Sequence, residues 1–271
     1  MITKNFSLCI CIYEKDTLTN IKLVFRGIFR NTILPNEILI LENGPLNFDL
    51  SNYLKNTNYP SIFKIIKLQF NIGLARGFNL LVRQCINEWI IKQDADDFSY
   101  KTRFAKLMKK AEEGYTLCGS FMQERYDNHL KFKRSVPINF LEIKNKIKYR
   151  NPFNNPTILV NKKIFNKLLG FPSINYKEDY ALWIIWLNYN NKIMNLSETL
   201  VSSINSKKLI QRRKETNSIK NELQIRRLLY TNQHVGYLLS WIIFFLRMFI
   251  FIAPLKLMNF FYLRILRSNA K

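Results

Sequence analysis

Histidine, metal-binding cysteine patterns and nucleophile motifs are largely missing from this chain of 271 residues. Its two histidines are isolated, and its four cysteines lack the spacing of a metal site. Cys9 and Cys11 lie two residues apart in one apolar segment, where disulfide geometry is poor, so we expect reduced thiols in the core and a cytoplasmic protein. Neither a Ser-His-Asp arrangement nor a P-loop appears, and no signal peptide is expected before the first strand.

Acidic residues are scarce. The chain has 19 Asp and Glu against 42 Lys and Arg, which gives a formal charge of +23 and a pI of about 9.9. Residues 207–271 alone hold 13 basic residues against 2 acidic ones. Such a tail attracts nucleic acid or an anionic membrane surface. Hydrophobic residues at 48% are ample for a core, which excludes a disordered chain.

The first hundred residues alternate between strand and helix patterns. Alternation at these intervals predicts βαβ units around a parallel sheet, with the loops after the strands gathered at one edge, where open α/β sheets bind ligands. The expected strands are 6–12, 37–41, 62–68 and 89–92, and the expected helices are 18–29, 50–54 and 74–86. Later segments predict helices at 101–113, 165–169 and 180–189, two strands within 115–132, a strand at 156–161 and a mostly helical tail beyond residue 205.

An acidic cluster follows the fourth predicted strand. Three of the chain's seven aspartates, Asp94, Asp96 and Asp97, fall within four residues of a strongly basic protein. Carboxylates this close repel unless a cation lies between them, and Mg²⁺ or Mn²⁺ held by one or two carboxylates completes its shell with phosphates. The cluster predicts a metal–diphosphate site. The alternative is an acidic turn that caps the helix starting near Lys101.

Two further segments each allow a functional and a structural interpretation. Asn71 to Asn79 could bring Arg76 and a helix N-terminus to a diphosphate, or could simply be a capped helix with a surface arginine. Glu178 and Asp179 precede an apolar helix. Asp179 is either a helix cap or a general base that takes a proton from an attacking hydroxyl.

The second half of the chain offers three more candidates. Asn151 to Thr157 is rich in amides and suits a polyhydroxylated ligand, although it could be an ordinary loop. Arg212 and Arg213 could clamp a phosphate or be solvated. Val235 to Leu255 is nearly continuous apolar sequence interrupted by Arg247. An in-plane membrane helix is favoured over packing on the catalytic domain or a true span.

Taken in order, these segments resemble the family 2 glycosyltransferases with the GT-A fold, the inverting bacterial type that builds surface polysaccharides. The resemblance covers about residues 5–267. It is carried by Ser-Leu-Cys-Ile-Cys-Ile-Tyr, Leu-Glu-Asn-Gly-Pro, Asn-x-Gly-x-Ala-Arg-Gly-x-Asn, Gln-Asp-Ala-Asp-Asp, Asn-Asn-Pro-Thr and Glu-Asp-Tyr-x-Leu-Trp. The tail fits a subgroup that acts on O-antigen, capsule or exopolysaccharide repeats. The Gln-x-x-Arg-Trp motif of processive synthases is missing, so one sugar per encounter is expected.

The resemblance implies an α/β catalytic domain over residues 1–205 and a basic, helical, membrane-associating and acceptor-binding region over residues 206–271. Asp179 would be the catalytic base, Asp94 would face the ribose and, with Asp96, the metal (Mn²⁺ or Mg²⁺), and Asp97 would support the turn. Two positions depart from the family pattern, because Asn43 replaces a common acid and Asn155 a common histidine. The nucleotide-sugar site would comprise Tyr13, Glu14, Glu42, Asn43, Asn71, Arg76, Asp94, Asp96 and Arg213, and the acceptor site Asn155, Thr157, Glu178 and Trp183.

The function so implied is transfer of one hexose or N-acetylhexosamine from a UDP-sugar to a lipid-linked or lipooligosaccharide glycan. The protein would work at the inner face of the cell membrane, bound through its C-terminal helices, as a monomer or an oligomer and without nucleic acid. Two rivals are a non-catalytic membrane-associated scaffold with a transferase fold and a basic nucleic-acid-binding protein. The second rival leaves the acidic cluster at a strand end unexplained.

Overall fold

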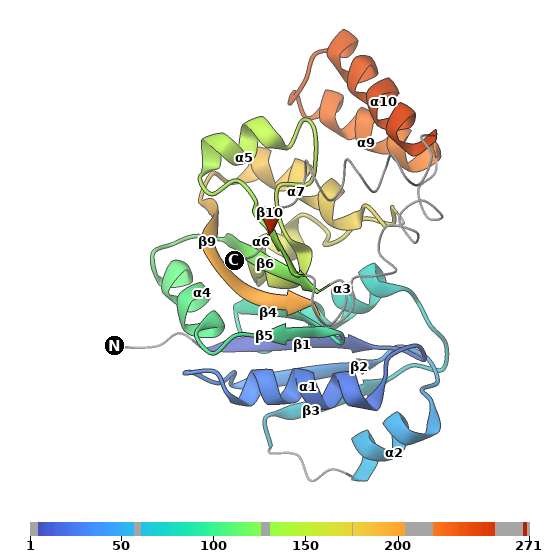
Figure 1. Ribbon diagram of the computed structural model, residues 1–271, viewed down its shortest axis with the longest axis vertical. Coiled ribbons are helices and arrows are strands. Elements are labelled where there is room, and N and C mark those ends of the chain that lie inside the picture. The colour runs from blue at the N-terminus through green and yellow to red at the C-terminus, as the bar shows by residue number, and fades with distance from the viewer. Residues whose placement is uncertain are drawn as a thin grey trace.

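The computed structural model describes residues 5–56, 61–125, 131–174, 176–203, 219–252 and 268–269, and Figure 1 shows their arrangement. Four parallel strands form the first half of a curled sheet in the order β3-β2-β1-β4. They are β1 (Phe6–Ile12), β2 (Glu37–Glu42), β3 (Phe63–Lys67) and β4 (Trp89–Asp94). The helices that connect them are α1 (Leu18–Phe29), α2 (Phe48–Asn56) and α3 (Leu74–Gln84).

Antiparallel strands extend the sheet beyond β4. The short β8 (Leu159–Asn161) lies between β4 and β6 (Leu117–Arg125), and β6 continues to β7 (Lys131–Arg134) and β10 (Ser268–Asn269). The long β9 (Ile193–Ser203) runs parallel to β6 and also pairs antiparallel with β5 (Asp97–Ser99). The remaining helices are α4 (Arg103–Glu112), α5 (Phe140–Lys146), α6 (Lys162–Lys167), α7 (Glu178–Tyr189), α9 (Ile219–Thr231) and α10 (Tyr237–Ile252), with one 3₁₀ turn, η1 (Asn155–Thr157).

The central strands are apolar on both faces because helices cover both sides of the sheet. Alternate side chains of β1 go to different cores, since successive side chains of a strand point to opposite faces. Leu8 and Ile10 join the cluster formed with α1, α2 and α4. Cys9 joins the cluster formed with α3, α6, α7, α9 and α10. The fold is therefore a three-layer α/β architecture, as the strand and helix alternation predicts.

Helices α9 and α10 belong to the same packed body as α7. Ile225 and Leu229 of α9 and Ile243 of α10 are buried in the cluster that contains the apolar side of α7. Both helices lie at the end of the molecule opposite α2 (Figure 1). Within the part of the chain that the structure describes, no helix has both the length and the apolarity needed to cross a bilayer.

Two elements were missed from sequence, and one predicted strand is wrong in part. Residues 193–203 form strand β9 and residues 140–146 form helix α5, although neither was predicted. The segment 156–161, expected as one strand, divides into the turn η1 and the short strand β8, because Pro156 occupies the 3₁₀ turn. Asp97, expected to support the turn, directly follows that turn as the first residue of strand β5.

Candidate active site

The strand ends of β1, β2 and β4 meet the start of α3 at the carboxyl edge of the parallel sheet. The Asn43 side chain after β2 accepts a hydrogen bond from the backbone N–H of Ile72 (2.9 Å). Gly44 has a positive φ of 91°, and a side chain there would approach the Asn71 backbone to 2.8 Å. Only glycine allows the two loops to lie this close, so the Asn-Gly pair holds the loop before α3 against the end of β2.

Gln93 organises the acidic turn from within β4. Its amide donates to the carbonyl oxygens of Asp94 (2.9 Å) and Asp97 (2.7 Å), and its own oxygen accepts from the Ser99 hydroxyl (2.7 Å). Gln93 is 1% exposed, so these bonds are shielded from water. The backbone from Asp94 to Asp97 is therefore fixed by a buried side chain, as a preorganised ligand site requires.

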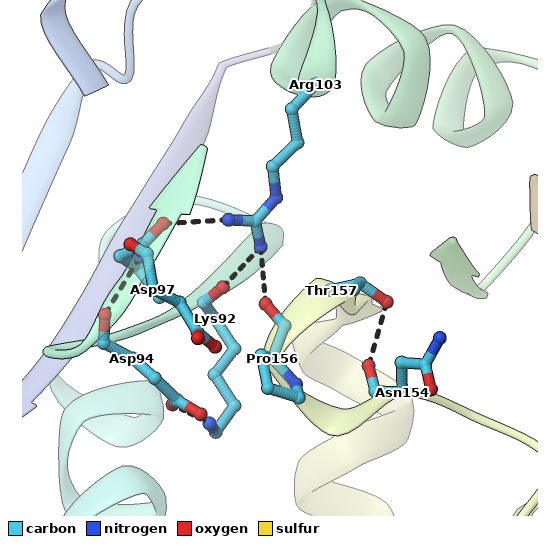
Figure 2. A network of polar contacts seen from close by, with 8 residues as sticks. Lys92, Asp94, Asp97, Arg103, Asn154, Pro156 and Thr157 are labelled. Carbon is cyan, nitrogen blue, oxygen red and sulfur yellow. Dashed lines mark hydrogen bonds and ion pairs between the residues drawn. The ribbon is translucent and has the colours of Figure 1, made fainter. Parts of the chain in front are cut away.

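A fully buried arginine joins this turn to a second loop. Arg103, at the start of α4, donates to Gln93 Oε1 (2.7 Å), Ser99 Oγ (2.8 Å), the Lys92 carbonyl (2.6 Å) and the Pro156 carbonyl (2.8 Å). Figure 2 shows the guanidinium between β4 and the turn that contains Pro156. Burial lowers the pKa of Arg103 to about 10, which leaves it charged at neutral pH.

Lys92 brings a buried positive charge to the acidic turn. Its side chain is 1% exposed, and its ammonium donates to the Asp94 carboxylate (Figure 2). Burial opposes the charge on Lys92, but the nearby carboxylates of Asp94 and Asp97 outweigh it and raise the Lys92 pKa. Asp94 is thus held in one orientation by a side chain two positions earlier on the same face of β4.

Asp16, at the end of the loop after β1, adds a further carboxylate. It is buried and accepts a hydrogen bond from the Tyr13 backbone N–H (2.9 Å). Burial, together with the charges of Asp96 and Asp94, raises the pKa of Asp16 to about 7. Burial and the same two charges also raise the pKa of Asp97 well above its usual range. Burial and mutual repulsion therefore favour the protonated forms of Asp16 and Asp97 at these strand ends.

This donor set fits a divalent cation that is completed by a ligand. Asp94 is half-buried and Asp96 is exposed at the tip of the turn. Among the described residues, no group of three or more carboxylate, histidine or cysteine side chains is placed to hold a metal ion by itself. A site with one or two carboxylates is the arrangement in which Mg²⁺ takes its remaining oxygens from substrate phosphates and water.

A second carboxylate pair lies at the first turn of α7. Asp179 accepts hydrogen bonds from the Tyr180 backbone N–H (2.7 Å) and from the Asn151 amide (2.7 Å). Burial raises the pKa of Asp179, although the hydrogen bonds from these two donors act to lower it. Burial and the adjacent Asp179 raise the pKa of Glu178 to about 7, with Lys92 lowering it and Asp94 raising it. The charges of Lys92 and Asp94 act on Glu178, so the pair at the start of α7 lies in the neighbourhood of the acidic turn.

The other residues predicted for the nucleotide-sugar site occupy the same edge. Glu14, Asn71 and Arg76 are exposed there, Tyr13 is half-buried, and Glu42 is buried and paired with Lys67 (3.0 Å). Arg76 lies in the first turn of α3, directly after the Asn71 to Gly73 loop, whose Gly73 N–H bonds to Asn71 Oδ1 (2.8 Å). Arg213, the last residue predicted for this site, lies outside the described residues.

Two of the four residues predicted to bind the acceptor are buried in the core. Trp183 is 0% exposed, and its ring packs on Phe153, Phe171 and Trp186. Thr157 is also 0% exposed, and its hydroxyl accepts from the Ser120 N–H (2.9 Å) and donates to the Asn154 carbonyl (2.8 Å). The prediction that either side chain contacts the acceptor directly is therefore wrong. Both belong to the core, whereas Asn155 and Glu178 remain partly accessible.

The residues that sequence reasoning missed are those that hold the site together. Asp16, Lys92 and Arg103 were not singled out, and Asn151 was expected to contact a ligand rather than Asp179. Asn79 binds both the N–H (2.9 Å) and the carbonyl (2.9 Å) of Phe171, so α3 is tied to the loop that leads to α7. A buried lysine before the aspartates in a strand was a visible signal, since lysine is seldom buried without a partner.

Comparison with known proteins agrees with this geometry. Residues 7–169 match the family model described as "Glycosyl transferase family 2". The chain is 25% identical to the amylovoran biosynthesis glycosyltransferase AmsE of Erwinia amylovora, over 95% of this chain and 97% of that protein. It is also 25% identical to an Escherichia coli protein named UDP-Gal:alpha-D-GlcNAc-diphosphoundecaprenol beta-1,3-galactosyltransferase, over 98% of each chain.

Solved structures share the fold. The crystal structure of S. aureus TarS 1-349 in complex with UDP-GlcNAc matches 96% of this chain and 76% of that one, with a TM-score of 0.68 at 14% identity. The structure of the same TarS fragment with UDP matches with a TM-score of 0.64 at 15% identity. The fold and the site thus define a GT-A enzyme, a glycosyltransferase. The chain belongs to glycosyl transferase family 2.

Proposed function

We propose that this protein moves one hexose or N-acetylhexosamine, with inversion, from a UDP-sugar to a glycan carried on a lipid diphosphate, in the synthesis of a bacterial surface polysaccharide. The observation that carries the proposal is the placement of Glu178 and Asp179 within electrostatic reach of the fixed acidic turn after β4. A donor side and an acceptor side are thus adjacent. The full-length similarity to AmsE and to the galactosyltransferase supports the polysaccharide setting.

On the donor side, Tyr13, Glu14, Glu42 and Asn43 line the nucleoside, and Asp94 faces the ribose. Arg76 approaches the diphosphate, where its guanidinium neutralises charge on the leaving UDP. Asp96 with Asp94 would hold Mn²⁺ or Mg²⁺, which when bound supplies further neutralisation of the diphosphate.

On the acceptor side, Asp179 is the general base. Its carboxylate takes the proton of the acceptor hydroxyl, and that oxygen attacks the anomeric carbon as the bond to the diphosphate oxygen breaks. The two hydrogen bonds from Asn151 and the Tyr180 N–H fix the direction of the carboxylate. The raised pKa of Asp179 strengthens it as a base, since proton transfer is most effective when the pKa of the base is near the working pH.

Contact with the inner face of the membrane is part of this proposal. Leu238, Ile242, Phe245 and Phe249 recur at helical spacing on α10 and are 73%, 47%, 63% and 72% exposed. An exposed apolar stripe of this kind on a basic segment suits in-plane binding to an anionic lipid surface. A lipid-linked acceptor would be delivered to the same surface.

The test is transfer by the purified protein. We expect it to use UDP-galactose, UDP-glucose or UDP-GlcNAc with a synthetic GlcNAc-diphosphate-lipid, and we would measure UDP release and product mass. Asp179→Asn should lower kcat by ~10²–10⁴-fold because general-base catalysis is lost, with UDP affinity unchanged. The matched control is Asp49→Asn, at an exposed aspartate of α2. Transfer undiminished in Asp179→Asn would overturn the assignment of the base, and transfer from no UDP-sugar would favour the scaffold.

A further inference from the structure

The Glu178–Asp179 pair is held from both sides by one buried polar network. Lys177, immediately before the pair, forms an ion pair with Glu222 of α9. Tyr180, immediately after it, accepts a hydrogen bond from the guanidinium of Arg247 on α10. Arg247 also bonds to Glu222 (3.3 Å), which closes the network. Residues of α9 and α10, which are distant in sequence, therefore contact both ends of the turn that carries the proposed base.

The same arginine reaches the segment that leads to the Asn151 amide. Arg247 donates to the carbonyl of Lys148 (3.4 Å), and the Tyr180 hydroxyl donates to the carbonyl of Ile147. Asn151, a few residues further on, donates to the Asp179 carboxylate. The backbone N–H that binds the other oxygen of Asp179 belongs to Tyr180 itself. Each of the two hydrogen-bond donors to Asp179 is thus in or near a segment that Arg247 contacts.

The charged side chains of this network are largely buried. The Glu222 side chain is 2% exposed, and those of Lys177 and Arg247 are 15% and 14% exposed. The Arg247 guanidinium also lies 5.1 Å from the centre of the Tyr180 ring. A buried carboxylate between two cations is costly to break on one side, and ionic groups of this kind can fix one geometry. The arginine within the apolar helix therefore faces the protein, while the apolar stripe of α10 faces outward.

We propose that Glu222 and Arg247 are positioning residues for the catalytic base, and that through them the position of α10 determines how Asp179 meets the acceptor hydroxyl. The inference rests on the proposed function, in which Asp179 is the base. The physical reason is that a displacement of about 1 Å at a reacting group can lower a rate by about a hundredfold. The network joins α7, α9 and α10, whereas the predicted donor residues lie at the ends of β1, β2 and β4 and the start of α3, so donor binding should be insensitive to it.

The experiment measures transfer from UDP-galactose to a GlcNAc-diphosphate-lipid by wild type, Glu222→Gln, Arg247→Gln and the double variant Glu222→Leu/Arg247→Leu. Both single variants should lose about 10–100-fold in kcat, with the KM for UDP-galactose within twofold. The double variant removes both charges of the Glu222–Arg247 pair and leaves only Lys177 without its partner, so its melting temperature should lie above those of the single variants while its kcat stays low. Arg247→Lys should retain part of kcat, because it keeps the positive charge but loses the planar guanidinium that donates to several partners. Arg227→Gln, an exposed arginine of α9, is the matched control.

A second measurement does not depend on the substrates. Amide hydrogen exchange at residues 177–181 should be faster in Glu222→Gln and Arg247→Gln than in wild type, and unchanged in β1 and β4. If the double variant recovers both melting temperature and kcat, the network is only structural and the inference fails. Unchanged exchange at 177–181 in both single variants also overturns it. Absence of transfer in wild type with normal exchange effects would instead count against the proposed substrates.

Discussion

Arg103→Met should weaken the fold and the donor site together. Arg103 makes four hydrogen bonds from a fully buried position, and the substitution leaves the Lys92 carbonyl, the Pro156 carbonyl and Gln93 Oε1 without this donor. Breaking a buried charged network typically costs ~3–5 kcal/mol. Methionine retains much of the apolar stem, so the lost stability reflects the missing guanidinium rather than lost packing.

That free energy is large beside the ~5–15 kcal/mol total stability of a typical domain. At ~2–4 °C per kcal/mol for a chain of this size, the melting temperature should fall by roughly 6–20 °C. Thermal unfolding followed by circular dichroism checks this, and Arg83→Met, at an exposed arginine of α3, is the control expected to change little. UDP affinity should also fall, because the turn after β4 loses its anchor to the η1 loop. A melting temperature of Arg103→Met equal to that of the Arg83→Met control would refute the reasoning.

Two further predictions concern pH and lipid. The folded-state pKa of Glu178, about 7, lies above its ordinary value, so the folded protein holds this proton more tightly than the unfolded chain. Its contribution to stability should therefore fall as pH rises from about 4.5 to 7, by up to ~3 kcal/mol, and Glu178→Gln should flatten this part of the stability curve measured by urea unfolding. A variant curve parallel to wild type would contradict it. Phe245→Glu/Phe249→Glu should abolish sedimentation with anionic phosphatidylglycerol vesicles, since each phenylalanine that is lost from the interface contributes ~1.5–3 kcal/mol of apolar burial. The control Phe48→Glu/Ile86→Glu changes side chains that are 81% and 77% exposed outside α10. It should sediment as wild type does, and equal sedimentation of both variants would contradict the lipid-binding role of α10.

Much of the donor half could be predicted from sequence because its information is local. Strand β1 and helix α1 have the predicted bounds, since the apolar run and the helical spacing each lie within one short window. The loop before α3 was also visible, because Asn71 and Gly73 mark a turn directly ahead of a helix. The acidic residues after β4 stand out in a strongly basic chain, and this local difference in charge is what made them a candidate site.

The supports of the site could not be predicted because their partners are distant in sequence. Arg103 reads as one more cation of an amphipathic helix, yet it binds Pro156, 53 residues later. Strand β9 alternates only weakly, and its identity comes from pairing with β5 and β6. Trp183 was expected at the acceptor from the family resemblance, but on a helix that is apolar all round it belongs to the core. Arg247 was visible only as a charge that interrupts an apolar run, and its ion pair with Glu222, 25 residues earlier, could not be predicted.

The most direct test of the central claim is calorimetric titration of UDP into the protein with and without Mn²⁺. The account predicts that Mn²⁺ strengthens UDP binding in wild type by ~5–150-fold, the usual range of coupling between two ligands. Asp96→Asn should lose this enhancement, whereas Asp49→Asn should retain it. Equal enhancement by Mn²⁺ in wild type and Asp96→Asn would contradict the claim that the carboxylates after β4 hold a cation for the sugar nucleotide.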